Sequence, residues 1–412
     1  MYSTTKGETW ESVAADNGLS VEELRGANPD VTRKKLKKGT LLIIPRRAVQ
    51  TIPSIDTSAP AEPVARTSIP NLKVGVLLPL SDAKMLEFYR GFLMAADSVR
   101  LSGVNLDIHA WDCGSSVSRI EDLTQNLRGL DIVFGPASPT QIPVVADYCR
   151  EAGIRLVLPF HDGLNYQEHP LVYHATAPAP VVYEAAAKGL LDYYDNKNFV
   201  IVRSGNPDAV GRMLSTSLTQ QLSQLGIIPR TLELGGDDFA YESAFNQFRS
   251  NVIVLDDSSV RSLNILVARL NDFRQKHSGY HLSLVGYPAW RDESQRLLND
   301  FFALDTYILS PSYYNVLDQR TQNFQRTYEK NFRATIIQGS PRYAALGFDL
   351  GYFFMQGLSQ LGDTFDQKQG DIPQEPYQNR FHFQRNASGM GFTNHFVQFI
   401  HYTNDNMIEL IR

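Results

Sequence analysis

From residue 71 onward, short apolar runs alternate with amphipathic stretches of helical period. Apolar runs of four to eight residues favour buried strands, and their alternation with helices is typical of a parallel sheet with helical crossovers. One series begins with a strand at 73–78, and a second begins with a helix at 181–195. The irregular stretch 160–180 separates the two series. We therefore expect an α/β fold of two lobes, each with a parallel sheet and helical crossovers.

The C-terminal part departs from this alternation. Two adjacent helices are predicted at 320–333 and 341–361, followed by a strand pair at 379–384 and 394–412.

Residues 1–46 carry their own helix signals. Thr9 can cap a first helix, and Ser20 with Glu23 has the spacing of a capping box that begins a second. The apolar run 41–44 predicts a closing strand. We expect a small βααβ module.

The stretch 47–70 is rich in Pro, Ser, Thr and Ala and has no apolar period. Such a composition predicts a semi-extended linker. The chain is therefore expected to have three parts, which are a module at 1–46, a linker at 47–70 and a large domain at 71–412.

The module carries residues at a characteristic spacing, which are Tyr2, Gly7, Glu8, Thr9, Gly18, Leu19, Ser20, Val21, Glu23, Leu24, Asn28, Pro29, Leu36, Gly39, Leu42, Ile44 and Pro45. With this set it resembles a LysM domain over its whole length, although Glu8 stands where that family commonly has Asp. The resemblance implies binding of N-acetylglucosamine polymers, chiefly peptidoglycan or chitin, in a groove between two loops. Carried over, the groove residues are Gly7, Glu8, Thr9 and Trp10 on one side and Ala27, Asn28, Pro29 and Asp30 on the other.

A structural interpretation of the same residues stays open. Thr9 and Asn28 can simply cap and end helices, and Trp10 can fill the small core.

The larger part contains an ordered series of segments, which are Val74 to Leu80, Gly91 to Asp97, Asp131 to Pro136 with Ser138, Leu156 to Pro159, and Tyr343 to Asp349. With this series it resembles the type I periplasmic binding proteins of the branched-chain amino-acid receptor group. The resemblance implies two doubly wound, Rossmann-like lobes joined by a hinge of several segments, with a ligand held between the lobes. It also implies that each lobe combines distant pieces of sequence, about 71–180 with 311–361 for the first lobe and about 181–310 with the strands of 379–412 for the second.

Ligands of open parallel sheets bind at the carboxyl ends of the strands, where helix N-termini also lie. By this rule the candidates for the inter-lobe cleft are Ser81, Asp82, Ala137, Ser138, Phe160, His161, Ser204, Asn206, Asp256, Asp257 and Tyr287. The resemblance implies that a hydroxyl near Ser138 holds a ligand carboxylate and that Asp256 or Asp257 holds an amine. The alternative is that these residues are ordinary helix caps and that ligand binding has been lost.

Two functions suit this architecture. The first is a non-catalytic cell-envelope protein that binds peptidoglycan and senses a small polar ligand or regulates an envelope partner such as a peptidoglycan synthase. The alternative is a receptor for amino acids or related small polar ligands that serves an ABC transporter. An envelope hydrolase is a weaker alternative, because His161-Asp162 and Glu168-His169 lie in a loop without metal-ligand spacing. We expect no catalytic residue, metal or cofactor.

The overall charge and the cysteines add further limits. A formal net charge of −5, from 39 basic and 44 acidic residues, gives no general attraction to nucleic acid. No apolar run is long enough for a transmembrane helix, and we expect a periplasmic or envelope location, with a signal peptide removed and lipid anchoring left open. Cys113 and Cys149 are expected to be buried thiols rather than a disulfide.

Overall fold

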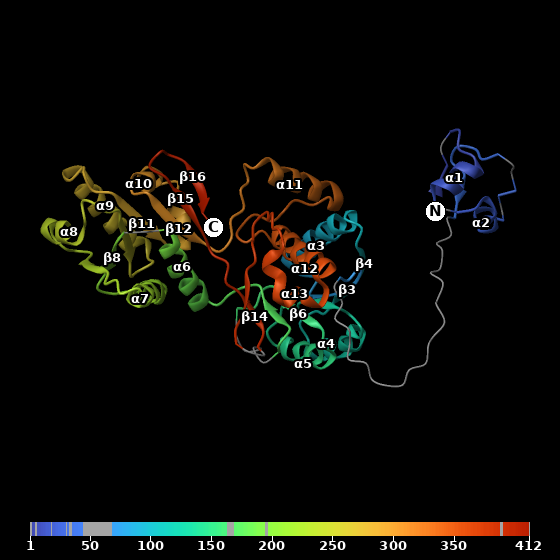
Figure 1. Cartoon of the computed structure of the whole chain (residues 1–412), viewed down its shortest axis with the longest axis horizontal. Coiled ribbons are helices and arrows are strands. Elements are labelled where there is room, and N and C mark those ends of the chain that lie inside the picture. Colours follow the sequence, from blue (N-terminus) through green and yellow to red (C-terminus); the bar gives the residue numbers. More distant parts are fainter. Residues whose placement is uncertain are drawn as a thin grey trace. The chain divides into compact units, whose positions relative to one another are not determined.

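The computed structural model describes residues 2–4, 6–17, 19–29, 31–32, 35–43, 68–162, 169–193, 197–387 and 390–411. The chain divides into two compact units, Met1–Val64 and Ala65–Arg412 (Figure 1). Apart from residues 68–70, the predicted linker lies outside the described residues.

The N-terminal unit has the predicted βααβ order, which is β1 (Tyr2–Ser3), α1 (Trp10–Asp16), α2 (Val21–Gly26) and β2 (Leu41–Leu42). The two strands pair antiparallel. A capping box begins each helix, formed by Thr9 with Ser12 and by Ser20 with Glu23. These boxes satisfy amide groups that a short helix leaves unpaired at its start.

The first lobe of the second unit is built on a seven-stranded sheet of order β13-β14-β7-β6-β5-β3-β4. Its strands are β3 (Asn71–Leu78), β4 (Asn105–Asp112), β5 (Ile132–Phe134), β6 (Arg155–Leu158), β7 (Val172–His174), β13 (Phe383–Arg385) and β14 (Phe392–Asn394). Its helices are α3 (Ala83–Leu101), α4 (Val117–Thr124), η1 (Gln125–Leu127), α5 (Ile142–Ala152), α11 (Gln319–Phe332), α12 (Tyr343–Leu361), η3 (Gly362–Thr364), α13 (Phe365–Lys368) and η4 (Gln369–Asp371).

Helices α3 and α12 of this lobe pack in backbone contact, although they are far apart in sequence (Figure 1). A Cβ atom on Gly91 would overlap the carbonyl of Ala344, and one on Gly347 would overlap the carbonyl of Phe88. The two glycines therefore set how closely α12 packs against α3.

The second lobe is built on a seven-stranded sheet of order β16-β15-β12-β11-β10-β8-β9. Its strands are β8 (Asn198–Arg203), β9 (Arg230–Glu233), β10 (Asn251–Leu255), β11 (Leu282–Gly286), β12 (Thr306–Ser310), β15 (Gln398–Tyr402) and β16 (Ile408–Ile411). Its helices are α6 (Ala179–Tyr193), α7 (Ala209–Gln224), α8 (Asp238–Ala244), α9 (Val260–Lys276), η2 (Pro288–Glu293) and α10 (Leu298–Ala303).

The predicted two-lobed, doubly wound architecture is confirmed. The parallel strands run in the order β4-β3-β5-β6-β7 in the first lobe and β9-β8-β10-β11-β12 in the second, so both lobes have the same 2-1-3-4-5 order. In each sheet the chain starts at an inner strand, adds a neighbour on one side and then continues on the other.

The C-terminal strands, which we predicted in the second lobe as part of 379–412, are divided between the lobes. β14 pairs parallel with β7, and the rings of Tyr173 and Phe392 stack with centroids 4.5 Å apart, so β13 and β14 extend the first sheet. Only β15 and β16 extend the second sheet. Apolar patterning identifies a strand but does not identify its partner strand.

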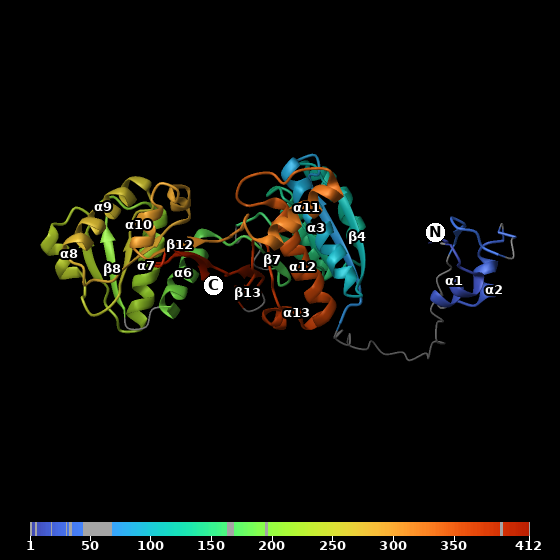
Figure 2. The ribbon, with the colours of Figure 1, turned by 90° about the horizontal axis from the view of Figure 1, so that it is seen from above.

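The chain crosses between the lobes three times, after β7, after β12 and after β14 (Figure 2). Each crossing leaves the carboxyl end of a strand. The Asn394 side chain joins two crossings, because its amide nitrogen donates to the carbonyl of Ala175 and its oxygen accepts the N–H of Phe396. The carboxyl edges of both sheets therefore lie on the side of the lobes where the crossings run.

Candidate functional site

In sheets of 2-1-3-4-5 order, a crevice opens at the carboxyl edge between the first and third strands, where the winding direction changes. These switch points lie between β3 and β5 in the first lobe and between β8 and β10 in the second. Most of the predicted cleft residues follow these four strands.

The edge of the first lobe is largely apolar. Leu80, Ala137, Phe160 and Tyr343 are partly exposed and pack against the buried core of this lobe. The Phe160 ring meets Phe88 edge to face at 5.1 Å and lies 6.0 Å from the Tyr343 ring. Together these side chains form a margin of the core, a partly exposed apolar surface at the switch point that includes two aromatic rings.

Polar groups surround this margin. Asp82 caps α3 by accepting the N–H groups of Lys84 and Met85, at 2.8 and 3.1 Å, and Ser81 beside it is exposed. The Ser138 hydroxyl lies 2.9 Å from that of Thr140. Part of this polar surface is thus a helix cap, while the hydroxyl pair remains at the surface.

Two residues that the sequence analysis did not select hold the first-lobe loops in place. The Asp112 carboxylate accepts the N–H groups of Leu80 and Gly114, both at 3.1 Å. The fully buried Gln141 amide donates to the carbonyls of Cys113 and Ser116. Cys113 and Cys149 are buried free thiols.

Three histidines of the first lobe are half-buried or buried, and of these His169 lies at the amino end of β7, away from this edge. His161 is partly exposed, and its ring lies 6.2 Å from that of His174. Burial lowers the pKa of His174 to about 4, and that of His169 also to about 4. His169 Nδ1 accepts the N–H of Leu171, while Glu168 lies outside the described residues. Within the described part of the chain, no three His, Cys, Asp or Glu side chains are placed to hold a metal ion.

The edge of the second lobe is polar but internally hydrogen-bonded. Asp256 accepts the N–H of Ser204 across the switch point at 2.8 Å. Asp257 accepts the N–H and hydroxyl of Ser259, at 3.0 and 2.9 Å, and the hydroxyl of Ser262. Both carboxylates, one of which we expected to hold a ligand amine, therefore bind groups of their own lobe.

Two other predicted residues of this edge, Tyr287 and Asn206, differ in burial. Tyr287 is fully buried, and its hydroxyl donates to the carbonyl of Leu255. Asn206 is exposed, and its N–H lies 3.3 Å from the Ser204 hydroxyl. Of these two residues, only Asn206 presents its side chain to solvent.

Asp208, which the sequence analysis did not select, is the central polar group of the second-lobe edge. Its carboxylate caps α7 through the N–H of Gly211 at 2.6 Å and also accepts the N–H and hydroxyl of Ser258. The Ser258 carbonyl in turn accepts the Trp290 indole N–H at 2.8 Å. An Asp directly before a helical pattern is the sequence signal that could have identified this cap.

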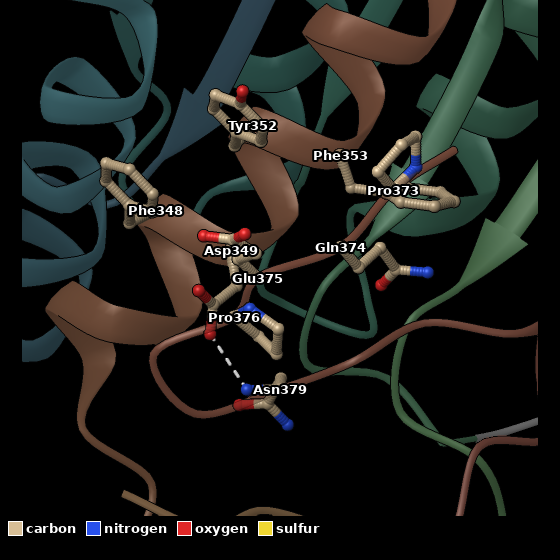
Figure 3. A pocket seen from close by; sticks show the side chains of 9 residues that line it. All are labelled: Phe348, Asp349, Tyr352, Phe353, Pro373, Gln374, Glu375, Pro376 and Asn379. Carbon is tan, nitrogen blue, oxygen red and sulfur yellow. Dashed lines mark hydrogen bonds between the residues drawn. The ribbon is translucent and has the colours of Figure 1, made fainter. Parts of the chain in front are cut away.

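A small pocket in the first lobe lies between α12 and the segment 373–379 (Figure 3). Asp349 at its base accepts the N–H groups of Tyr377, Gln378 and Asn379, each at 2.8 Å, and Figure 3 marks the last of these bonds. Burial raises the pKa of Asp349 to about 7 against the lowering effect of these donors. The Gln378 carbonyl accepts the N–H of Tyr313 in the second crossing, so Asp349 helps to hold the hinge.

The predicted glycan-binding residues of the N-terminal unit also divide by burial. Trp10 lies in the core, not at the surface, because its ring packs with Val13, Ala14, Leu24 and Leu42. Asn28 is buried as well, and it joins α2 to β2 by donating to the carbonyls of Leu24 and Ile43 and accepting the N–H of Ile43.

The remaining residues of that set lie nearer the surface. Gly7, with φ +101°, Thr9 and Pro29 are exposed, whereas Glu8 and Ala27 are half-buried. Asp30 lies outside the described residues. Of this set, the residues that are exposed enough to contact a glycan therefore lie in the loops around Gly7 and Pro29.

Comparison with known proteins finds no matching family model and no matching curated protein. Solved structures do match. A candidate branched-chain amino acid ABC transporter protein from Rhodospirillum rubrum is 13% identical with a TM-score of 0.55, covering 83% of this chain and 100% of its own. A substrate-binding protein from Desulfitobacterium hafniense in complex with Leu is 16% identical with a TM-score of 0.42, covering 83% and 100%. A branched-chain amino acid substrate-binding protein from Streptococcus pneumoniae in complex with isoleucine is 16% identical with a TM-score of 0.40, covering 82% and 98%.

At these identities the likeness concerns the fold. The two seven-stranded lobes agree with the two-lobed fold of the type I periplasmic binding proteins. In the described part of the chain, no helix is long and apolar enough to cross a membrane.

Proposed function

We propose that this chain is a non-catalytic binding protein of the cell envelope or periplasm that holds a small organic ligand between the carboxyl edges of its two lobes. The observation that carries the proposal is that all three crossings leave carboxyl ends of strands, which brings both switch points to the hinge side. The likeness to the Rhodospirillum rubrum protein, described as a candidate branched-chain amino acid ABC transporter, supports a receptor role.

A ligand screen on the full chain tests this function. Thermal unfolding would be followed with amino acids, organic acids, sugars and muropeptides, and small-angle scattering would report closure of the lobes. A ligand at a hundred times its dissociation constant should add about 2.7 kcal/mol to the free energy of unfolding. If no compound raises the unfolding temperature or makes the chain more compact, the receptor role is wrong.

A second function is proposed for the N-terminal unit, which is binding of peptidoglycan or a related N-acetylglucosamine polymer. It is supported by the βααβ order, the two capping boxes and the residues that match the LysM pattern. Sedimentation with purified peptidoglycan should retain the full chain and release a chain that begins at residue 65. Equal retention of both chains would exclude this role for the unit.

The two proposals together allow a regulatory role, in which the ligand-binding domain contacts an envelope enzyme such as a peptidoglycan synthase. Crosslinking in cells distinguishes this role from transport. A regulator should crosslink to a synthase, whereas a transport receptor should crosslink to a membrane permease.

A further inference from the structure

The first-lobe edge has a partly exposed apolar surface. Phe160 and Tyr343 are partly exposed, and Phe88 packs beneath Phe160. Leu80 and Ala137 continue the same surface at the ends of β3 and β5. Apolar side chains at a switch point favour a ligand with a bulky apolar body.

A cation lies beside this surface. The Lys84 ammonium is 5.7 Å from the centre of the Tyr343 ring, on the first turn of α3. Among the described residues no carboxylate forms an ion pair with it. Arg291 at the second-lobe edge also lacks an ion pair in the described part of the chain, and its guanidinium lies 3.4 Å from Ser310 Oγ and from the Ser312 carbonyl. A negatively charged ligand group would complement either side chain.

The carboxylates of the second switch point already have hydrogen-bond donors in their own lobe. Asp256, Asp257 and Asp208 accept backbone N–H groups and hydroxyls of their own lobe. A buried ammonium needs a charged or strongly polar acceptor, and these carboxylates already use part of their accepting capacity within their own lobe.

We infer that the ligand is a monocarboxylate with an aromatic or similarly bulky apolar body, and that this site does not need a ligand ammonium. The body rests on Phe160 and Tyr343, and the carboxylate is placed at Lys84. This inference rests on the proposed ligand-binding function and narrows its substrate class.

Isothermal titration of the full chain with four probes tests the inference. The probes are phenylacetate, L-phenylalanine, phenethylamine and L-leucine. Phenylacetate should bind at least tenfold more tightly than L-phenylalanine or L-leucine, and phenethylamine should not bind. If either amino acid binds tenfold more tightly than phenylacetate, the receptor function stands and this inference is overturned.

Two further results would also overturn it. Binding of only sugars or muropeptides in the wider screen would place another ligand class at the site, and the absence of any ligand would overturn the proposed function as well. The first result would overturn only the ligand class, whereas the second would overturn the ligand class and the proposed function together.

Surface variants provide the residue-level test, because Lys84 is exposed and its replacement leaves the core intact. Lys84→Glu should weaken phenylacetate binding at least tenfold. The matched control is Lys73→Glu, an exposed lysine at the opposite end of β3, which should change the affinity less than twofold. Phe160→Leu, which retains an apolar side chain, should weaken binding of phenylacetate more than binding of an aliphatic acid such as isovalerate. Equal affinities for all three variants and the wild-type chain would overturn the proposed placement.

Discussion

The two lobes have the same strand order, but their carboxyl edges differ in chemistry. In the first lobe, Leu80, Phe160 and Tyr343 leave part of the core exposed at the switch point. In the second lobe, Asp208 and Asp256 bind the loop ends to one another. The first edge therefore leaves apolar side chains partly exposed, whereas the second is held mainly by hydrogen bonds between its own loops.

This difference indicates a division of roles. A lobe whose switch point is closed by its own hydrogen bonds supplies a rigid surface, because buried polar groups are costly to leave unpaired. A lobe with an exposed aromatic margin supplies the favourable contact area. Topology alone would have assigned both edges the same role.

The largest loss of stability is expected on substitution of Gly135 and Gly211, the two glycines at which backbone segments come into close contact at the switch points. A Cβ on Gly135, which has φ +93°, would overlap the Leu77 carbonyl, and one on Gly211 would overlap the backbone of Asp256. Gly135→Ala should lower the free energy of unfolding by about 3 kcal/mol or more and Gly211→Ala by about 2 kcal/mol, since only the first adds backbone strain. Urea denaturation measures both.

The control is Gly189→Ala in the middle of α6, where the new methyl group would meet only Phe399, at 3.8 Å. It should stabilise the chain by up to about 1 kcal/mol. If Gly135→Ala and Gly211→Ala behave like this control, the switch points are not closely packed.

A smaller loss of stability is expected when the helix caps of the two edges are removed, and the loss should differ between the edges. Asp82 caps α3 at an exposed position, whereas Asp208 caps α7 and also holds Ser258. Asp82→Ala should cost about 1 kcal/mol and Asp208→Ala about 2 kcal/mol in the same unfolding measurement. Equal losses would mean that the second edge is no more tightly bonded than the first.

The sequence predicted most of this scaffold because buried parallel strands are continuous apolar runs. The predicted strands at 198–203 and 251–255 coincide with β8 and β10. β7 was missed because it is three residues long and lies in an irregular stretch, and the lobe of β14 depends on pairing with β7, more than 200 residues away. Local patterning carries no information about such a partner.

The chemistry of the candidate site was less predictable than its position. The rule of strand ends selected Asp256 and Asp257, but whether a carboxylate is free depends on donors such as Ser204 and Ser262, which the fold supplies. The environment of Asp349 could not be predicted from the sequence either. It lies within an apolar helical run, and only the fold brings three amide donors to it.

Asp349 makes a pH response of the first lobe testable. Burial raises its pKa to about 7, so the folded chain holds a proton that the unfolded chain has already lost. Its contribution to stability is complete below about pH 4 and is lost as the pH rises through about 7. The difference in unfolding free energy between the wild-type chain and Asp349→Asn should therefore shift in favour of the variant between pH 4 and pH 7 and stay constant above.

The exposed Asp97 on α3 provides the control, since Asp97→Asn should show no such trend. A flat difference for Asp349→Asn across the same range would mean that its three amide donors keep the carboxylate ionised.

The smallest effect is expected at Asp257, and it tests the comparison of the two edges directly. Its carboxylate accepts three groups from Ser259 and Ser262, so Asp257→Asn should cost about 1 kcal/mol of stability. The affinity for a ligand identified in the screen should nevertheless change less than twofold, because the wild-type carboxylate faces its own lobe. Titration of the variant with that ligand provides the measurement. A tenfold loss of affinity at unchanged fold would show that the second edge opens to contact the ligand, and the division of roles between the lobes would then be wrong.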